Sequence, residues 1–164
     1  MQHHTEEQKL PIGKVLGRIP SGVFVLSAAH GDTRAAMLAS WVQQASFEPP
    51  TISIAIAKGR PIAGLIRASS MLAISIIAEN DKSLMKRYAR GTKDGEDPFA
   101  DVAVQQSPLG VPILSDALGW LEAKLISTCD FSADHEILIG QITAAALLRE
   151  GPAFAHQRGN GFHY

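Results

Sequence analysis

"AMLASWVQQASFEPP" (residues 36–50) is the stretch that best predicts the fold. Its order is unusual for a core strand, because an apolar start gives way to small and polar residues around Trp41. The stretch ends at Glu48 and two prolines, and a proline has no backbone N–H with which to continue a strand ladder. We therefore predict one strand over residues 36–47 that stops at the prolines.

Strand-like segments flank this stretch on both sides. VFVLSAA (23–29) is rich in β-branched and aromatic residues, and HGDTR (30–34) has the composition of a turn. The segments 23–29 and 36–47 are therefore expected to be partner strands. TISIAIA (51–57) alternates with a period of two, which predicts a half-buried strand. Its apolar face is formed by Ile52, Ile54 and Ile56.

The hydrophobic period changes after this third strand. In RPIAGLIRASS (60–70), Ile62, Leu65 and Ile66 are spaced as one face of a helix. Pro61 suits the first turn of that helix, where its missing N–H costs no hydrogen bond. The spacing predicts a short amphipathic helix.

A strand and a second helix are predicted next. MLAISIIA (71–78) returns to the composition of a strand. NDKSLMKRYARG (80–91) is typical of a short helix, with Asn80 or Asp81 as its N-cap and Gly91 as its end.

The rest of the chain predicts a turn-rich excursion followed by a hairpin. Residues 92–112 are dense in turn-forming residues and are expected to lie on the surface. Two long apolar segments follow, residues 117–131 and 135–148, and the short link 132–134 favours a hairpin between them.

These elements predict a protein that is mostly β with short helices. About six strands follow one another instead of alternating with helices, which favours an antiparallel barrel over a doubly wound parallel sheet. The 164 residues fit one domain. We expect residues 1–11 to be a polar N-terminal arm and residues 12–164 to form the single domain.

Composition excludes several classes of function. Forty-six per cent of the residues are hydrophobic, and the net charge is −1, which gives no electrostatic attraction to nucleic acid or to an anionic membrane. No apolar run approaches the roughly 18 residues of a membrane span. The single cysteine, Cys129, cannot form an intramolecular disulfide, and the polar N-terminus lacks a signal-peptide core. We expect a cytoplasmic protein.

Familiar catalytic and metal-binding motifs are absent from the sequence. It has no G-x-x-x-x-G-K-[ST] loop, no G-x-G-x-x-G after a strand and no H-E-x-x-H. His3 and His4 are adjacent, but on a predicted arm they are poor candidates for metal ligands. The single cysteine cannot form the paired cysteine spacing of a zinc site. We predict no metal site. Cys129 lies in a strand pattern and is expected to be a small buried side chain.

Two cations precede the helix that begins at Pro61. Lys58 and Arg60 lie at its N-terminus, where a positive charge is unfavourable by about 0.3–1 kcal/mol when exposed. The arrangement is explained if an anion binds there to the backbone N–H groups and to both side chains. The alternative is that both are solvated surface charges.

The opening stretch offers groups suited to a flat ligand. Ala39 and Ser40 are small enough for a ligand to approach the backbone, and Ser40 and Ser46 carry hydroxyls. Backbone N–H groups at an irregular strand end can donate to the carbonyls and nitrogens of a heterocycle. Trp41 could form a wall of such a site or simply pack in the core.

Most of the chain resembles the flavin reductase-like family. This is a group of FMN-binding split barrels that includes the C-terminal reductase domain of cyanobacterial diflavin flavoproteins. The run at 36–50 is its most specific part, since the diflavin group shows almost the same residues. The other segments that carry the resemblance are 19–28, 52–62, 112–127, 134–142 and 156–164.

The resemblance implies a six-stranded antiparallel split barrel that forms a homodimer and binds FMN, or occasionally FAD. It places the ring and ribityl chain of the flavin along one short set of residues and the flavin phosphate at Lys58 and Arg60. It also places His135 where the nicotinamide approaches. The residues expected along the ring and ribityl chain are Leu38, Ala39, Ser40, Trp41, Ser46 and Phe47.

The function implied is that of an NAD(P)H:flavin oxidoreductase. Hydride would pass from NAD(P)H to N5 of the flavin, and the electrons would then pass to a partner protein. Two positions differ from the pattern of the family, Ala133 before the Asp-His pair and Ser75 in place of an asparagine. These differences leave an alternative, a non-catalytic FMN-binding redox-carrier module.

Overall fold

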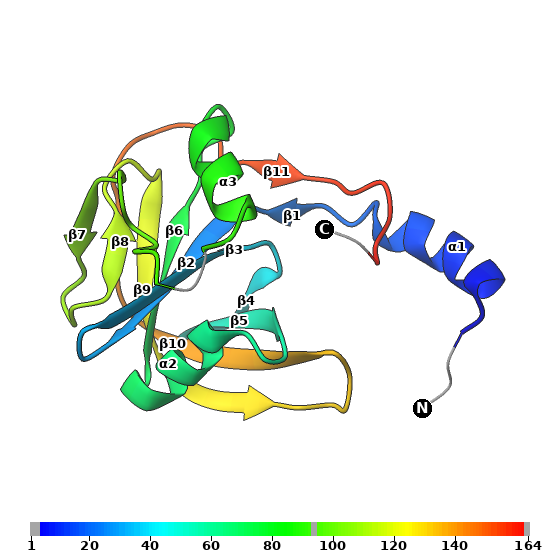
Figure 1. Cartoon of the computed structure of the whole chain (residues 1–164), viewed down its shortest axis with the longest axis horizontal. Helices are drawn as coiled ribbons and strands as arrows, with labels where there is room; N and C mark the ends of the chain where they lie inside the picture. The colour runs from blue at the N-terminus through cyan, green and yellow to red at the C-terminus, as the bar shows by residue number, and fades with distance from the viewer. Residues whose placement is uncertain (1–3, 93–94, 163–164) are drawn as a thin grey trace.

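Seven antiparallel strands form the main sheet of the protein (Figure 1). The computed structural model describes residues 4–92 and 95–162. The order of strands across the sheet is β3-β2-β6-β9-β10-β5-β4. Their bounds are β2 (Phe24–His30), β3 (Thr33–Ala39), β4 (Val42–Phe47), β5 (Pro50–Ala57), β6 (Met71–Ile76), β9 (Gly119–Cys129) and β10 (His135–Leu147).

The strand predicted over residues 36–47 is in fact two strands. β3 pairs with β2 and ends at Ala39, whereas β4 begins at Val42 and pairs with β5. β3 and β4 are therefore the two opposite edges of the sheet, although only Ser40 and Trp41 separate them. The prediction of one strand was wrong because both linking residues are compatible with a strand, and only the pairing partners reveal the break.

The predicted hairpins and the alternating strand are confirmed. His30 pairs with Thr33 around a two-residue turn, in which Gly31 adopts a φ of 56°. The hairpin expected around 132–134 joins β9 to β10. Along β5 the three isoleucines are buried and the residues between them are half-buried, as their alternation predicts. These isoleucines belong to the main core with Leu26, Leu72 and Leu138.

Both predicted helices are present where expected. α2 (Pro61–Ser69) begins with its proline and buries Ile62 and Ile66 against the sheet, while Leu65 is partly buried there. α3 (Lys82–Ala89) is capped by Asp81, whose carboxylate accepts from the N–H of Leu84 at 3.1 Å.

The N-terminal segment differs from the predicted polar arm. Residues 6–11 belong to α1 (Glu6–Leu16), which Thr5 and Gln8 start with a reciprocal capping box. In Figure 1 this helix projects from the barrel beside the C-terminal segment. The first three residues of the predicted arm, and residues 163–164 of the predicted domain, lie outside the described residues.

The excursion predicted over residues 92–112 contains more structure than its composition indicates. β7 (Val104–Gln106) pairs with β8 (Pro112–Leu114), and Phe99 and Val111 are buried. A second small pair joins β1 (Ser21–Gly22) to β11 (Ala155–His156) and carries the chain towards α1. Among the described residues, no helix is both long and apolar enough to cross a membrane.

A buried carboxylate anchors this excursion to the main sheet. Glu122 on β9 is fully buried. It accepts hydrogen bonds from the hydroxyls of Ser107 and Thr143 and, at 2.8 Å, from the N–H of Leu109. The buried Glu122 and the buried Ser107 therefore satisfy each other, and the loop before β8 is fixed over β9.

Replacement of Glu122 by glutamine should destabilise the fold. The amide would turn an NH2 group towards at least one of the three donors, and leaving a buried polar group unsatisfied costs about 1–3 kcal/mol. Urea unfolding of Glu122→Gln should show this loss, while Glu79→Gln, at an exposed position, should leave stability unchanged. Equal stability of Glu122→Gln and the parent protein would contradict this account of the network.

Candidate functional site

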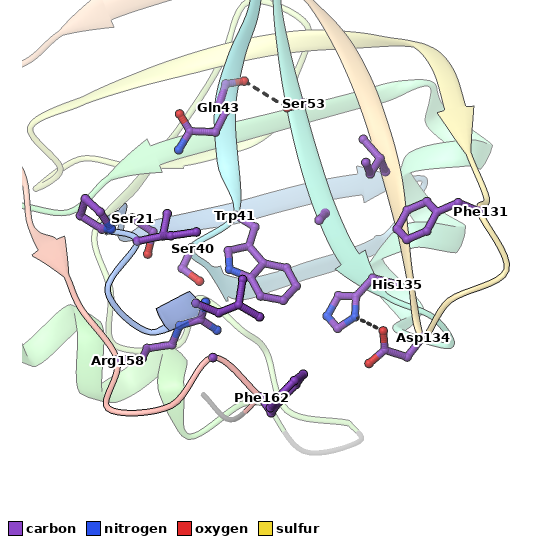
Figure 2. Close-up of a pocket in the computed structure, with 16 residues that line it drawn as sticks. Ser21, Ser40, Trp41, Gln43, Ser53, Phe131, Asp134, His135, Arg158 and Phe162 are labelled. Atoms are coloured by element: carbon purple, nitrogen blue, oxygen red, sulfur yellow. Dashed lines mark hydrogen bonds and ion pairs between the residues drawn. The ribbon is translucent and has the colours of Figure 1, made fainter. Parts of the chain in front are cut away.

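A cavity of about 650 Å³ lies beside the chain crossing between β3 and β4 (Figure 2). This volume is typical of a small-molecule site, for which the range is roughly 300–1,000 Å³. Apolar side chains contributed by α1, the β9–β10 loop and the C-terminal segment line much of it, including Leu16, Phe131 and Phe162. Polar groups are fewer and include Ser40, Gln43, Ser53, His135 and Arg158.

Trp41 occupies a central place among the residues around the cavity. Its ring centroid lies 4.8 Å from that of His135, with the two planes tilted by 49°. The guanidinium carbon of Arg158 lies 5.1 Å from the Trp41 ring centroid, within the range of a cation–π interaction. In Figure 2 the indole lies between Arg158 and His135. Three side chains from separate segments therefore meet at one aromatic ring.

His135 reaches the cavity because β10 begins there. It pairs in register with Ala57 on β5, and its Nδ1 lies 2.9 Å from Oδ1 of Asp134. The hydrogen bond that His135 donates lowers the pKa of the Asp134 carboxyl. Nδ1 is therefore the ring nitrogen that faces Asp134. The imidazole is therefore held in a defined orientation next to Trp41.

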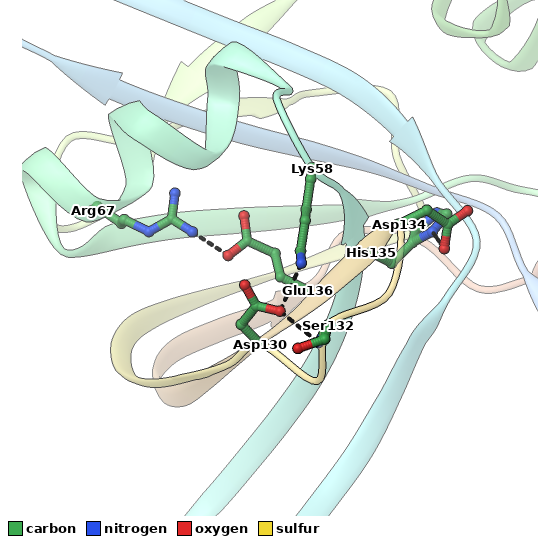
Figure 3. Close-up of polar contacts among 7 residues, drawn as sticks. All are labelled: Lys58, Arg67, Asp130, Ser132, Asp134, His135 and Glu136. Atoms are coloured by element: carbon green, nitrogen blue, oxygen red, sulfur yellow. Dashed lines mark hydrogen bonds and ion pairs between the residues drawn. The ribbon is translucent and has the colours of Figure 1, made fainter. Parts of the chain in front are cut away.

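Lys58 ties the β9–β10 loop to the end of β5 (Figure 3). Its Nζ lies 2.6 Å from Oδ1 of Asp130, and its backbone N–H donates to the carbonyl of Asp134 at 2.9 Å. Asp130 also accepts from the N–H of Ser132 at 2.8 Å. The hydrogen bond from Lys58 lowers the pKa of the Asp130 carboxyl. The loop that carries Phe131 is thus held by the charged side chain of Lys58, which directly follows β5.

A second ion pair links α2 to β10. Arg67 on the helix donates to the carboxylate of Glu136, which follows His135 and is largely buried. Arg60 is the N-cap of α2, and its exposed side chain makes no capping hydrogen bond. One ion pair therefore links the β9–β10 loop to Lys58, which precedes α2, and the other links α2 itself to β10.

The structure brings together three of the residues predicted from the sequence. Ser40, Trp41 and His135 line the cavity, whereas Lys58 and Arg60 lie at the start of α2 and do not line it.

The other predicted residues lie along the two edge strands. On β3, Leu38 is half-buried and Ala39 is buried in the core. On β4, the hydroxyl of Ser46 donates to the carbonyl of Pro49 and accepts from Thr51 at 3.0 Å. Phe47 is 86% exposed, so its ring is accessible on the surface.

Sequence reasoning missed Arg158 and Phe131 as cavity residues. Both lie in irregular segments, where hydrophobic periodicity gives no signal. The terminal segment was recognised through its resemblance to the family, but nothing in that pattern indicates which element it packs against. Among the described residues, no cluster of three or more His, Cys, Asp or Glu side chains could hold a metal ion. The expectation that Cys129 is buried was wrong, because the end of β9 that carries it is exposed.

Comparison with known proteins decides the family. The model of the flavin reductase like domain matches residues 16–161. The chain belongs to the flavin reductase like domain family. It is 39% identical over 153 residues to diflavin flavoprotein A 1 of Synechocystis sp., a match that covers 92% of this chain and 26% of that protein. The chain thus spans about a quarter of the length of such relatives.

Solved structures of flavin reductases share the fold. The NADH:FAD oxidoreductase SgcE6 of Streptomyces globisporus superposes with a TM-score of 0.83 at 22% identity, covering 97% of this chain and 95% of that one. BorF, the flavin reductase component of a bacterial two-component tryptophan halogenase, gives a TM-score of 0.79 at 23% identity, over 89% and 91% of the two chains. The predicted split barrel is confirmed, with seven strands in its main sheet in place of six.

The chemistry of the cavity fits a flavin. A tricyclic ring needs an apolar, partly aromatic surface, and Trp41 and Phe131 provide one. The carbonyls and nitrogens of the ring need hydrogen-bonding groups, and Ser40, Gln43 and Ser53 are polar residues that line the same cavity. The cavity therefore combines a planar apolar surface with a few polar groups, as small-molecule sites do.

The Lys58–Asp130 pair should make part of the stability depend on acid pH. Because the pKa of Asp130 is lowered by folding, its stabilising contribution is complete above the ordinary pKa of aspartate and is lost as pH falls through the lowered value. Asp130→Asn should be less stable than the parent protein at neutral pH, and the difference should shrink in acid.

Thermal unfolding across a pH series measures this difference. Glu150→Gln, an exposed carboxylate elsewhere, controls for the general loss of one negative charge. A gap between Asp130→Asn and the parent protein that stays constant down to strongly acid pH would contradict the assignment.

Proposed function

We propose that this chain is an NAD(P)H:flavin oxidoreductase that binds FMN in the cavity beside Trp41. The observation that supports the proposal is the meeting of Trp41, His135 and Arg158 at this cavity, in a member of the flavin reductase like domain family. A bound flavin supplies the redox chemistry by accepting a hydride at N5, and the protein supplies binding, orientation and electrostatics.

The proposed flavin contacts follow the two edge strands. The ring lies against Trp41 and the backbone from Leu38 to Ser40, and Ser46 and Phe47 flank the ribityl chain. Ser40 and Trp41 support this placement because both line the cavity. Phe47 supports it through its exposure, which leaves its ring accessible to a ligand. FAD is the alternative flavin, as in the NADH:FAD oxidoreductase SgcE6.

His135 is proposed to orient the nicotinamide. Its hydrogen bond with Asp134 fixes the imidazole next to Trp41, and this orientation supports a positioning role. Hydride transfer needs no general base from the protein, so the His135–Asp134 pair at the cavity is proposed to hold an orientation. The imidazole would therefore align the two rings without exchanging a proton.

The flavin phosphate is proposed to bind Lys58 and Arg60 at the N-terminus of α2. The backbone N–H groups of a helix N-terminus favour an anion, and Arg60 is exposed there. The ammonium group of Lys58 would leave Asp130 to bind the phosphate, or would bind both groups at once. Binding of the phosphate would thereby loosen the β9–β10 loop.

Replacement of Lys58 and Arg60 together by alanine should weaken the binding of FMN more than the binding of riboflavin, which has no phosphate. The loss of charge-assisted hydrogen bonds should raise the Kd of FMN by about 10- to 100-fold and leave that of riboflavin within about twofold. Fluorescence titration of both flavins measures the effect. Lys82→Ala with Arg90→Ala, which removes two exposed cations from α3, is the matched control. Equal losses for both flavins would refute the phosphate assignment.

Replacement of His135 by alanine should slow flavin reduction by NADH while leaving flavin affinity unchanged. Loss of the orienting group should lower the reduction rate by about tenfold or more, because small misplacements of reacting groups cost up to ~100-fold. Anaerobic stopped-flow mixing gives the rate, and His30→Ala, at an exposed turn, is the control. Loss of flavin from His135→Ala would show that the histidine holds the ring instead.

A redox-carrier module without reductase activity is the second candidate. The hydroxyl of Ser75, which replaces the asparagine typical of the family, is buried and accepts from the N–H of Leu114 at 3.0 Å. This side chain is therefore used within the core. An anaerobic titration with FMN and then NADH separates the two candidates, since the oxidoreductase bleaches the flavin absorbance and the carrier does not.

We also propose a homodimer that acts in the cytoplasm and passes electrons to an acceptor protein. Exposed apolar side chains on and after α1, namely Leu10, Val15 and Ile19, support a second copy as a partner. The single cysteine suits a reducing compartment. The match to one quarter of a diflavin flavoprotein supports an acceptor that carries its own redox centre.

A further inference from the structure

Arg158 is the only arginine or lysine among the residues that line the cavity within the described parts of the chain. Its side chain is half-buried, and its guanidinium lies over the face of Trp41. Among residues 4–92 and 95–162, no carboxylate is close enough to form an ion pair with it. The guanidinium is therefore a permanent positive charge that forms no ion pair within these segments, while Asp134, the acidic side chain on the same lining, is bonded to His135.

The position of Arg158 is fixed by its backbone. Its N–H donates to the carbonyl of Gly17 at 3.0 Å, and the N–H of Gly161 donates to the carbonyl of Gly13 at 2.7 Å. A Cβ added at Gly17 would lie 2.5 Å from the carbonyl oxygen of Arg158, so only glycine permits this approach. The terminal segment is thus docked on the end of α1, which places the side chain of Arg158 beside Trp41.

A guanidinium held in this way is suited to a phosphate group. A guanidinium over an aromatic ring keeps five N–H donors in its own plane, and these can still bind an anion. Arginine binds phosphate oxygens in pairs, and such charge-assisted hydrogen bonds are about twice as strong as neutral ones. The chemistry therefore favours an anionic ligand group over a carbonyl or hydroxyl.

We propose that Arg158 binds the diphosphate of the nicotinamide dinucleotide, an inference that rests on the proposed function. The ring centroid of His135 lies 4.8 Å from that of Trp41, and the guanidinium carbon of Arg158 lies 5.1 Å from the same centroid. Figure 2 shows the two side chains on either side of the indole. In the dinucleotide, a ribose similarly separates the nicotinamide ring from the diphosphate. A nicotinamide at His135 thus extends its diphosphate towards Arg158, while the flavin phosphate is assigned to the start of α2, where Lys58 and Arg60 do not line the cavity.

Equilibrium binding tests the proposal without any turnover. With FMN present, calorimetry would compare NAD⁺ with nicotinamide riboside, which lacks the diphosphate. Arg158→Gln should raise the Kd of NAD⁺ by about 10- to 100-fold and change the Kd of nicotinamide riboside by no more than about twofold. Arg158→Lys, which keeps the charge, should recover part of the loss. Arg18→Ala removes an exposed cation near the end of α1 and should leave the affinity for both ligands unchanged.

Kinetics supply the second comparison, with NADH and with 1-benzyl-1,4-dihydronicotinamide, a reductant without phosphates. Arg158→Gln should raise the KM for NADH and leave kcat/KM for the benzyl compound unchanged. Both variants keep the backbone N–H that docks on Gly17, so the thermal unfolding temperature should be unchanged.

Several outcomes overturn the proposal. Equal losses of affinity for NAD⁺ and nicotinamide riboside in Arg158→Gln would show that Arg158 only supports the shape of the cavity. A loss of FMN affinity relative to riboflavin would assign Arg158 to the flavin phosphate. If the parent protein binds NAD⁺ no more tightly than nicotinamide riboside, the diphosphate is not recognised at all. Failure of the parent protein to oxidise either reductant would instead count against the proposed function.

Discussion

The backbone hydrogen bond from the N–H of Ala55 to the carbonyl of Trp41, at 3.0 Å, is the interaction on which the arrangement depends. It extends the β4–β5 ladder back to the residue that has just left β3, so the chain passes from one edge of the sheet to the other within two residues. Trp41 is thereby fixed at the crossing. Because β5 also pairs with β10, the same strand brings His135 to the other side of the indole.

The sequence was sufficient where structure is determined by local patterns. The alternating isoleucines of β5 and the proline at the start of α2 each act within a single element, and each predicted the element that carries it. Ser40 and Trp41 fit a strand locally, so their break depends on which distant strands β3 and β4 pair with. The start of α1 was signalled by Thr5 and Gln8, although Pro11 and the polar composition favoured an arm.

The candidate site shows the same division between local and distant information. Resemblance to the family was enough to find Ser40, Trp41 and His135, which line the cavity. It was not enough to find Asp130, which pairs with Lys58 from 72 positions away, or Arg158, whose place depends on docking to α1. The charges that a ligand meets are therefore set by tertiary contacts, with Lys58 paired in the structure and Arg158 directed to the cavity.

The central claim is that a flavin ring binds at the chain crossing, against Trp41 and beside His135. A crystal structure of the protein with FMN tests it most directly. The account predicts the isoalloxazine ring in contact with the Trp41 indole, inside the cavity that Ser40 and Phe131 also line. A flavin bound elsewhere on the barrel, out of contact with the Trp41 indole, would contradict it.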